Sequence, residues 1–372
     1  GDARSSRRDL ELPARWEIPV DLSWLTEHFG DAGSATIGGG AVGLLFGIAA
    51  QRSRFCLRSA TTEFWRGSLG PSTAIWLLAF GAALLGVQLL FQASVLDSTS
   101  VRQLSTTGSL SGAIIGGLMF GSGMILARGC ASRLLVLSAT GNLRALITGL
   151  ILTVVAQASL RGVLSPVRLE LASLWLVGPE ARNLMDHVPH NSGLAASLVI
   201  LALAAGLAMH HKFSATLVAT SLTVGIAVTA GWWFTATLAS QSFDIVPIQS
   251  VSFTGPSTDT LMAVVNQPNL ALGFGLGLVP GVFAGSLLSS VMTGDFRIQT
   301  FNDQTPLPRY IAGACLMGFG SMLAGGCAVG AGMTGGAVLA LTAWIALACM
   351  WLGAGMTDLL VDRKPDQIAV TR

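Results

Sequence analysis

Nine apolar stretches of membrane length constrain the fold of this 372-residue chain more than any other feature of its sequence. A membrane-spanning helix needs roughly 20 apolar residues, and each stretch is near that length. The sequence therefore predicts an all-α polytopic membrane protein with about nine transmembrane helices. The stretches cover residues 35–51, 71–95, 109–127, 144–160, 192–209, 213–240, 269–292, 309–324 and 337–358.

The composition favours the same fold class. Hydrophobic residues make up 52% of the chain and charged residues only 11%, whereas soluble domains carry about 25% charged residues. Glycine contributes 45 residues, and small residues are favoured where membrane helices pack closely. A soluble globule of this size could not bury so much apolar surface, so we expect a lipid bilayer around the chain.

Charge and motif content exclude several classes of function. The net charge is +2, and no basic run is longer than Arg7–Arg8, so nucleic acid is not an expected partner. The five histidines lack metal-ligand spacing to cysteines or carboxylates, and no glycine loop of the Walker type is present. The sequence therefore predicts no metal site, no cofactor, no nucleotide hydrolysis and no enzymatic activity.

The polar ends flank the membrane region. Residues 1–34 are polar and rich in arginine and tryptophan, and they lack the apolar core of a cleavable signal peptide. We interpret them as an interfacial N-terminal extension. Residues 359–372 form a polar C-terminal tail, which leaves residues 35–358 as the transmembrane transport domain.

An internal repeat divides the transmembrane domain. Ile114–Ala131 and Ile311–Ala328 align without gaps and share 9 of 18 residues, including Gly-Cys-Ala at their ends. The repeat matches stretches one to four with stretches six to nine, an offset of five spans. Because five is odd, equivalent helices cross in opposite directions, and the sequence predicts an inverted repeat of four plus one plus four helices.

The two repeats have their own predicted boundaries. The first covers about residues 35–160 and the second about 213–358, with a connector helix at about 192–209. Several stretches are short and run directly into glycine-rich, partly polar sequence. Short, interrupted segments at matching places in two halves are typical of re-entrant or broken helices that line a transport site.

The distribution of positive charge predicts the orientation. The N-terminus and the loops after even-numbered stretches hold 8 lysines and arginines, and the remaining loops with the C-terminus hold 13. Positive residues are enriched on the inner side, so we expect an N-terminus outside and a C-terminus inside. The arginines of the N-terminal extension argue for the reverse.

Three of the five cysteines stand where an apolar helix gives way to small or polar residues: Cys56, Cys130 and Cys327. Cys315 and Cys349 lie inside apolar runs and are interpreted as small buried hydrophobes. The chain has no CxxC pair, so a thioredoxin-like redox motif is absent.

The cysteines at the breaks suit a soft anion. Gly129, Gly325 and Gly326 precede them and allow the backbone to approach a ligand closely. A helix that restarts after a break points its N–H groups into the gap, where they favour an anion. A thiol beside these groups is a weak donor for a polarisable acceptor such as sulfur. The alternative is that these cysteines are simply packed in the core.

Two residues and one polar stretch near the breaks each allow two interpretations. Arg128 stands where the second repeat has Gly325, and it either attracts a dianion or acts as an ordinary positive-inside anchor. Thr334 either lines the gap at Cys327 or caps the following helix. The polar stretch 249–259 corresponds by the repeat to the region of Cys56 but has no cysteine, and it is either a hydroxyl-lined break or a simple loop.

Three segments carry a family resemblance: FCLRSA at 55–60, RGCASRLL at 128–135 with GNLRAL at 141–146, and GGCAVGAGMTGG at 325–336. They resemble the signature segments of the YeeE/YedE family of bacterial inner-membrane proteins, and the resemblance extends from about Gly39 to Met356. It places the expected N-terminus in the periplasm and the C-terminus in the cytoplasm.

The resemblance implies uptake of thiosulfate through an hourglass-shaped protein with cysteines at successive constrictions. In such a protein the anion is relayed by S–H···S hydrogen bonds, here along Cys56, Cys130 and Cys327. The family also implies a small cytoplasmic sulfur-carrier protein, sometimes fused through a domain with a Cys-Pro motif. This chain has no Cys-Pro, so such a partner would be a separate protein.

Other functions stay open at this point. The cargo could be another sulfur or selenium species, because the chemistry selects a soft acceptor without naming it. A membrane thiol oxidoreductase would need a reactive cysteine pair, and no pair is spaced as one in the sequence. A structural or assembly subunit with inert cysteines is the third alternative.

Overall fold

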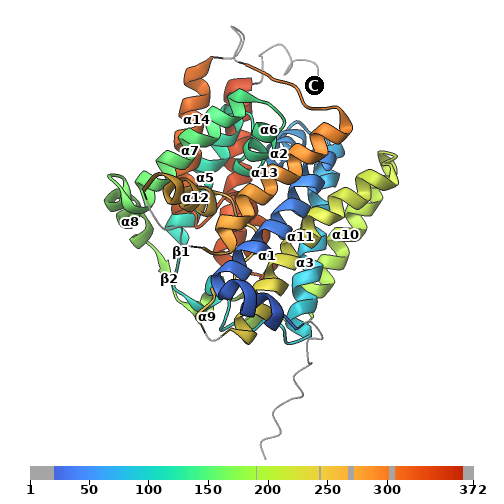
Figure 1. The fold of residues 1–372 in the computed structure, drawn as a ribbon. Coiled ribbons are helices and arrows are strands. Elements are labelled where there is room, and N and C mark those ends of the chain that lie inside the picture. Colours follow the sequence, from blue (N-terminus) through green and yellow to red (C-terminus); the bar gives the residue numbers. More distant parts are fainter. Residues whose placement is uncertain (1–20, 190, 243, 267–271, 301–305, 363–372) are drawn as a thin grey trace, which may run out of the picture.

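The computed structural model describes residues 21–189, 191–242, 244–266, 272–300 and 306–362, and helices dominate this part of the chain (Figure 1). Nine of the helices or helix pairs within these ranges are long and apolar enough to cross a membrane. The predicted fold class, an all-α polytopic membrane protein, is therefore confirmed. Residues 1–20 of the predicted extension and 363–372 of the predicted tail lie outside the described residues.

The long helices follow the apolar stretches of the sequence. Their bounds are α1 (Ser23–Ser53), α3 (Pro71–Gln92), α5 (Leu110–Leu126), α7 (Leu143–Arg161), α10 (Ser192–His210), α11 (Ala215–Gln241), α13 (Phe274–Thr293), α14 (Leu307–Leu323) and α16 (Leu341–Thr357).

Short helices complete or flank these spans. Those that continue a broken span or precede one are α2 (Leu57–Trp65), α6 (Ala131–Ala139), α12 (Thr254–Asn266), and the π-helical segment η2 (Ala328–Thr334) with α15 (Gly335–Ala337). Those at the periphery are α4 (Arg102–Ser105), α8 (Ser165–Ser173), α9 (Pro179–Arg182), η1 (Leu184–Asp186) and η3 (Asp358–Asp362). Strands β1 (Gly108–Ser109) and β2 (Leu176–Val177) pair antiparallel.

Polar caps mark where several of these helices begin. The Ser109 hydroxyl accepts a hydrogen bond from the Gly112 amide at 2.8 Å at the start of α5. The Asn142 side chain accepts from the Ala145 amide at 3.1 Å at the start of α7. Such caps satisfy amides that have no partner inside the helix, a need that is acute where lipid replaces water.

The first helix begins earlier than the sequence suggested. α1 starts at Ser23, so residues 23–34 of the predicted interfacial extension are helical and continuous with the first span. Gly30 interrupts α1 with a φ of 68°, a left-handed conformation that glycine adopts without steric cost. The polar composition of this first turn hid a helix whose apolar part starts only after the kink.

Helices α5 and α14 pack against each other in antiparallel directions. A Cβ added at Gly123 would lie 2.7 Å from the Gly313 carbonyl oxygen, and one added at Gly320 would lie 2.7 Å from the Gly116 carbonyl oxygen. Early residues of one helix thus meet late residues of the other. Because α5 and α14 carry the sequence repeat, their antiparallel packing makes the repeat an inverted one.

The other elements obey the same relation. Helices α2, α5 and α6 begin 197 residues before α12, α14 and η2, respectively. The pair α1 and α13 has its counterpart in α11 and α3, and the pair α5 and α16 has its counterpart in α14 and α7. The odd helix is α10, which packs against α3 and is otherwise largely exposed. The chain starts α1 at one end of the molecule and ends α16 at the other (Figure 1).

Candidate functional site

The three cysteines at helix breaks share one local geometry. Each is the last residue before a short helix: Cys56 before α2, Cys130 before α6 and Cys327 before η2. All three have extended backbone and buried side chains. The positive ends of three helices therefore begin at a thiol inside the membrane-spanning part of the molecule.

A left-handed residue stands two positions before each cysteine. Arg54 has a φ of 54°, Arg128 of 55° and Gly325 of 81°. This residue ends the preceding helix and turns the chain, so the next two residues extend across the gap before the new helix starts. The breaks can be predicted from the sequence but this common turn cannot, because arginine does not signal a left-handed conformation as glycine does.

The glycines at the breaks differ in how strictly they are needed. Gly326 has a φ of 156°, and an added Cβ would lie 2.8 Å from the Ala331 amide nitrogen. Gly325 has open space around it but is left-handed. Gly129 has no positive φ, and an added Cβ would make ordinary contact with Leu134 at 3.4 Å. Among the predicted glycines, backbone geometry thus restricts Gly325 and Gly326.

The fold brings two of the cysteines together. The side chains of Cys56 and Cys130 lie near each other, although 74 residues separate them in the chain. The thiol of Cys130 also lies 3.3 Å from the Ser132 hydroxyl. Both cysteines are free thiols in this structure. The sequence offered no adjacent pair, and only the tertiary fold creates one.

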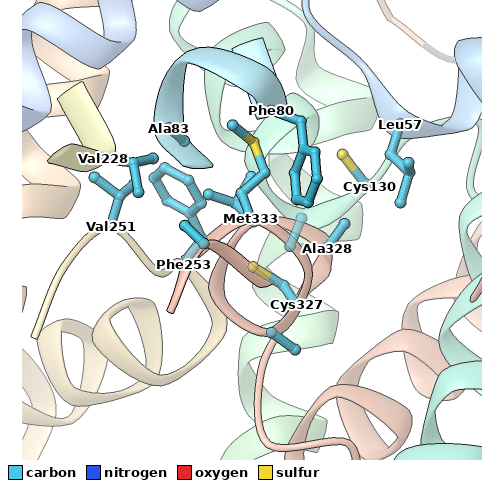
Figure 2. Packing of buried hydrophobic residues seen from close by; sticks show 14 of the residues in the cluster. Leu57, Phe80, Ala83, Cys130, Val228, Val251, Phe253, Cys327, Ala328 and Met333 are labelled. Atoms are coloured by element: carbon cyan, nitrogen blue, oxygen red, sulfur yellow. The ribbon is translucent and has the colours of Figure 1, made fainter. Parts of the chain in front are cut away.

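Cys327 lies apart from that pair. Its sulfur accepts a hydrogen bond from the Gly330 amide at 3.5 Å, across the first turn of η2. Figure 2 shows the sulfur atoms of Cys327, Cys130 and Met333 around Ala328 and Phe80, all from the buried centre of the molecule. Cys327 and Met333 of the second repeat thus belong to the same buried cluster as Cys130 and Phe80 of the first.

The arginines near Cys130 have different surroundings. Arg128 is exposed, because the turn at this position directs it away from the core. Arg133, in the first turn of α6, is half-buried and its charge acts on the Cys56 thiol. The positive group beside the cysteine pair is thus Arg133, which the predicted site residues did not include.

Thr334 connects two elements of the second repeat. Its hydroxyl donates to the Val251 carbonyl oxygen at 2.6 Å, and its side chain is buried. It makes no side-chain cap for α15. Neither sequence interpretation describes this contact, which ties η2 to the extended segment that leads into α12.

That extended segment corresponds to the region of Cys56. Phe253, the last residue before α12, stands 197 residues after Cys56. Its ring lies 5.1 Å from that of Phe46, which in turn lies 6.4 Å from that of Phe55, measured between centroids. Extending the repeat alignment would have found this position. An aromatic cluster thus replaces the fourth thiol that perfect symmetry would require.

Some hydroxyls of the same segment bind the backbone. Ser250 donates to the Val228 carbonyl oxygen at 2.5 Å, and Thr235 donates to that of Gln249 at 2.6 Å. The Thr254 hydroxyl is buried and has no hydrogen-bond partner within the described residues. Residues 249–253 are therefore an extended connection to α12, and of the five hydroxyls in 249–259 those of Ser250 and Thr258 bind carbonyl oxygens of the described backbone.

The remaining two cysteines do not join the breaks. Cys349 on α16 is buried, as predicted, whereas Cys315 on α14 is only partly buried. Cys315 lies one residue after a contact face that the glycines of α14 form with α5, so it turns partly outward. In the part of the chain that the structure describes, no group of three or more His, Cys, Asp or Glu residues could hold a metal ion.

A cavity of about 260 Å³ lies between α6, α7, α12 and α13. It reaches Ala131, directly after Cys130, and Phe253 with Thr254 at the start of α12. Its walls are predominantly aliphatic, including several leucines of α6 and α7. Such a lining suits apolar chains of lipid, and it gives a desolvated anion no compensation.

The comparisons with known proteins agree with this arrangement. A family model described as sulphur transport matches residues 52–356. A protein of Escherichia coli (strain K12) named thiosulfate transporter TsuA is 26% identical over 369 residues, covering 90% of this chain and 97% of the relative.

A protein of the same name from Spirochaeta thermophila (strain ATCC 700085 / DSM 6578 / Z-1203) is 27% identical over 332 residues, covering 84% of this chain and 94% of the relative. The matched region contains all three breaks and both of the aligned repeat segments, 114–131 and 311–328. Because the family model covers most of the chain, this multi-pass membrane protein belongs to the sulphur transport family.

Proposed function

We propose that this protein takes up thiosulfate across the bacterial inner membrane by passing the anion along buried thiols. The names of the two relatives support the choice of cargo, and the family description supports transport of a sulfur compound. The observation that carries the proposal is the common geometry of Cys56, Cys130 and Cys327, each buried at the start of a helix inside a broken span.

The physical problem is to desolvate a dianion without trapping it. An uncompensated charge in the hydrocarbon region is prohibitively costly. The positive helix ends and the S–H donors compensate part of that cost, and several weak sites in series let the ion enter and also leave. A nearby anion disfavours a second negative charge, so the thiols stay protonated and act as donors.

In this proposal the anion binds at two successive sites, which we call stations. Cys56 and Cys130 form one station, where Arg133 supplies positive charge. Cys327 forms the other, where Gly325 and Gly326 bring the backbone close to the anion. Gly129 forms the extended link before Cys130, and the exposed Arg128 attracts the anion from solution toward the station of Cys56 and Cys130. Thr334 holds η2 in place.

The proposal includes an orientation and a partner. We infer an N-terminus in the periplasm and a C-terminus in the cytoplasm from the distribution of positive residues. A separate small cytoplasmic sulfur-carrier protein would receive the sulfur after transport. Residues 35–160 and 213–358 act as the two halves of the transport domain, joined by α10.

One observation favours a second candidate. The proximity of Cys56 and Cys130 is what a membrane thiol oxidoreductase would need. Such an enzyme would oxidise the two thiols to a disulfide and pass two electrons and two protons to an acceptor such as a quinone. Thiol labelling before and after treatment with a quinone separates this candidate from transport, because a relay leaves both thiols reduced.

The test of transport is uptake of ³⁵S-thiosulfate by cells that lack their own sulfur import. We expect the parent chain to support uptake in excess sulfate, and Cys327→Ala to reduce it at least tenfold at equal expression. Cys315→Ala is the matched control, because this cysteine lies within α14 and away from the breaks.

The outcomes separate cargo from mechanism. Uptake that survives Cys327→Ala would contradict the thiol relay and leave transport in place. Absence of thiosulfate uptake by the parent would contradict the proposed cargo, and the same assay with selenium and other sulfur anions would then identify it.

A further inference from the structure

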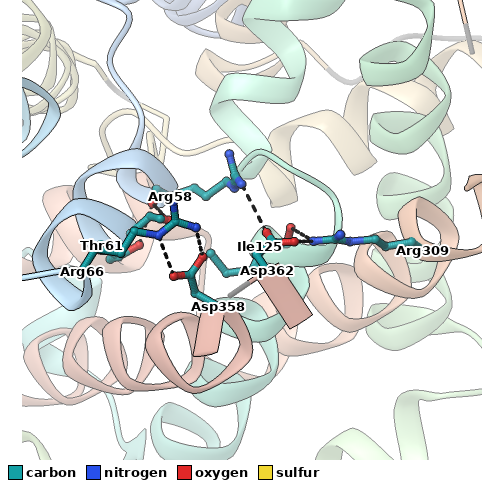
Figure 3. A network of polar contacts seen from close by, with 8 residues as sticks. Arg58, Thr61, Arg66, Ile125, Arg309, Asp358 and Asp362 are labelled. Atoms are coloured by element: carbon teal, nitrogen blue, oxygen red, sulfur yellow. Dashed lines mark hydrogen bonds and ion pairs between the residues drawn. The ribbon is translucent and has the colours of Figure 1, made fainter. Parts of the chain in front are cut away.

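Two carboxylates of η3, Asp358 and Asp362, form three ion pairs with arginines of other elements. Asp358 is fully buried and accepts two hydrogen bonds from Arg66, at 3.0 Å from Nε and 2.8 Å from Nη2. Asp362 accepts from Nη2 of Arg309 at 2.8 Å, and Nη2 of Arg58 lies 3.7 Å from it. Figure 3 shows Arg58 and Arg309 reaching toward Asp362 from opposite sides.

The arginines around Asp358 and Asp362 differ in whether all their buried N–H groups have hydrogen-bond partners. The pair of Arg66 and Asp358 is bidentate, and its hydrogen bonds raise the pKa of Arg66 above the usual value. By contrast, the Nε–H groups of Arg58 and Arg309 are buried and have no partner within the described residues. A buried donor without a partner costs about 1–3 kcal/mol, so a structural ion pair would not be expected to leave two of them.

The incomplete cluster lies beside the cysteine pair. Arg58 follows Cys56 by two residues in the first turn of α2. Arg309 also donates to the Ile125 carbonyl oxygen at 3.3 Å, in the last turn of α5 before the break that leads to Cys130. Through their common partner Asp362, the two guanidinium groups therefore connect α2, which follows Cys56, with the end of α5, which precedes Cys130.

The cluster is partly accessible to water. The exposed fractions of the side chains are 24% for Arg58, 18% for Arg309 and 16% for Asp362. Ion pairs with partial hydration are worth little net free energy, so an incoming anion can displace the carboxylate. An anion with oxygens on several sides can also accept from the Nε–H groups, which a single carboxylate cannot reach.

We propose that Arg58 and Arg309 form an anion subsite next to the Cys56–Cys130 station, and that Asp362 is a tethered carboxylate that fills the subsite when it holds no anion. The ligand is a doubly charged sulfur oxyanion. The proposal rests on the proposed function and deepens it. Asp362 competes with the dianion for the two arginines. This competition weakens the binding of the dianion and favours release of the dianion from the subsite.

The subsite recognises charge and oxygen atoms, whereas the thiols recognise sulfur. It should therefore bind sulfate as well as thiosulfate. The test is the affinity of the purified full-length chain in detergent for ³⁵S-thiosulfate and ³⁵S-sulfate. We expect Asp362→Asn to tighten the binding of both anions at least threefold, because the competing carboxylate is removed.

The arginine variants have the opposite expected result. Arg58→Gln and Arg309→Gln should each weaken the binding of both anions at least threefold. Arg52→Gln is the matched control, because Arg52 is an exposed arginine at the end of α1 that makes no ion pair with Asp362. It should change affinity by less than twofold, since it alters only the general charge of that end.

Folding is monitored by the thermal unfolding midpoint with and without sulfate. Sulfate should raise the midpoint of Asp362→Asn more than that of the parent, because it refills the vacated site. Unchanged or weaker sulfate affinity in Asp362→Asn would overturn the subsite. Failure of the parent to transport thiosulfate would contradict the proposed function instead, and the sulfate measurements would still decide the subsite.

Discussion

Gly325 and Arg128 stand at equivalent positions of the two repeats and adopt the same left-handed turn, yet only one of them lacks a side chain. A left-handed conformation costs roughly 1–2 kcal/mol for a residue with a Cβ. Such strain persists where the surrounding structure holds the residue in place. The turn itself, and not the glycine, is therefore what the two breaks have in common.

Gly325 allows this cost to be measured without steric interference. Gly325→Ala should lower the free energy of unfolding by about 1–2 kcal/mol, because a Cβ there meets open space and only the positive φ opposes it. Gly206→Ala is the matched control, since Gly206 also has open space but a helical conformation in α10. Thermal unfolding in detergent measures both. Equal midpoints for the two variants would contradict the strain.

At the scale of the helix, the glycines of α5 and α14 could be predicted to matter because they recur in the repeat. Gly116, Gly123, Gly313 and Gly320 are all identical between the two halves, and they form the antiparallel contact. Hydropathy and the repeat were also sufficient to place the spans and the breaks at Cys130 and Cys327. These features are local, so a single sequence contains them.

The features that the sequence did not reveal depend on long-range contacts. Cys56 lies near Cys130 only because α2 and α6 both begin near the centre of the fold. Arg133 rather than Arg128 lies beside these thiols because of the direction of a turn. Asp362 lies in a segment that looked like a polar tail, and its partners lie on α2 and α14.

The helix contact gives a prediction of its own. Gly123→Ala should lower the free energy of unfolding by about 1–3 kcal/mol through overpacking, because its Cβ would lie 2.7 Å from the Gly313 carbonyl oxygen. Uptake should fall as well, since both breaks follow the ends of these helices. Thermal unfolding and ³⁵S-thiosulfate uptake measure the two effects, and Gly206→Ala again serves as the control. A stable, fully active Gly123→Ala would show that the helices can separate freely.

For the molecule as a whole, the inverted repeat does not determine which end faces the cytoplasm, so we infer the orientation in the membrane from the distribution of charge. The two halves present related structures to the two sides of the membrane, so the fold alone prefers neither direction. The excess of lysine and arginine on the side of the C-terminus is the basis of the proposed orientation. The orientation is therefore best tested with positions on opposite ends of the molecule.

Labelling in intact cells tests this orientation. In a Cys315→Ala background, a membrane-impermeant thiol reagent should label Thr99→Cys and not Lys212→Cys, because Thr99 follows α3 and Lys212 precedes α11 at the other end. Both positions are exposed. Permeabilised cells provide the control, where both variants should react. Labelling of Lys212→Cys alone in intact cells would reverse the proposed orientation.

Helix α10 contributes less to packing than any other span, since its contacts are concentrated on α3 and most of its surface is exposed. Its importance is that it adds a single membrane crossing between the two halves of the chain. During insertion, one extra crossing makes the second half enter the bilayer upside down relative to the first. Without it the halves would insert in the same direction, α5 and α14 would run parallel, and their glycine faces could not meet. A helix with few neighbours thus determines how all the others can pair.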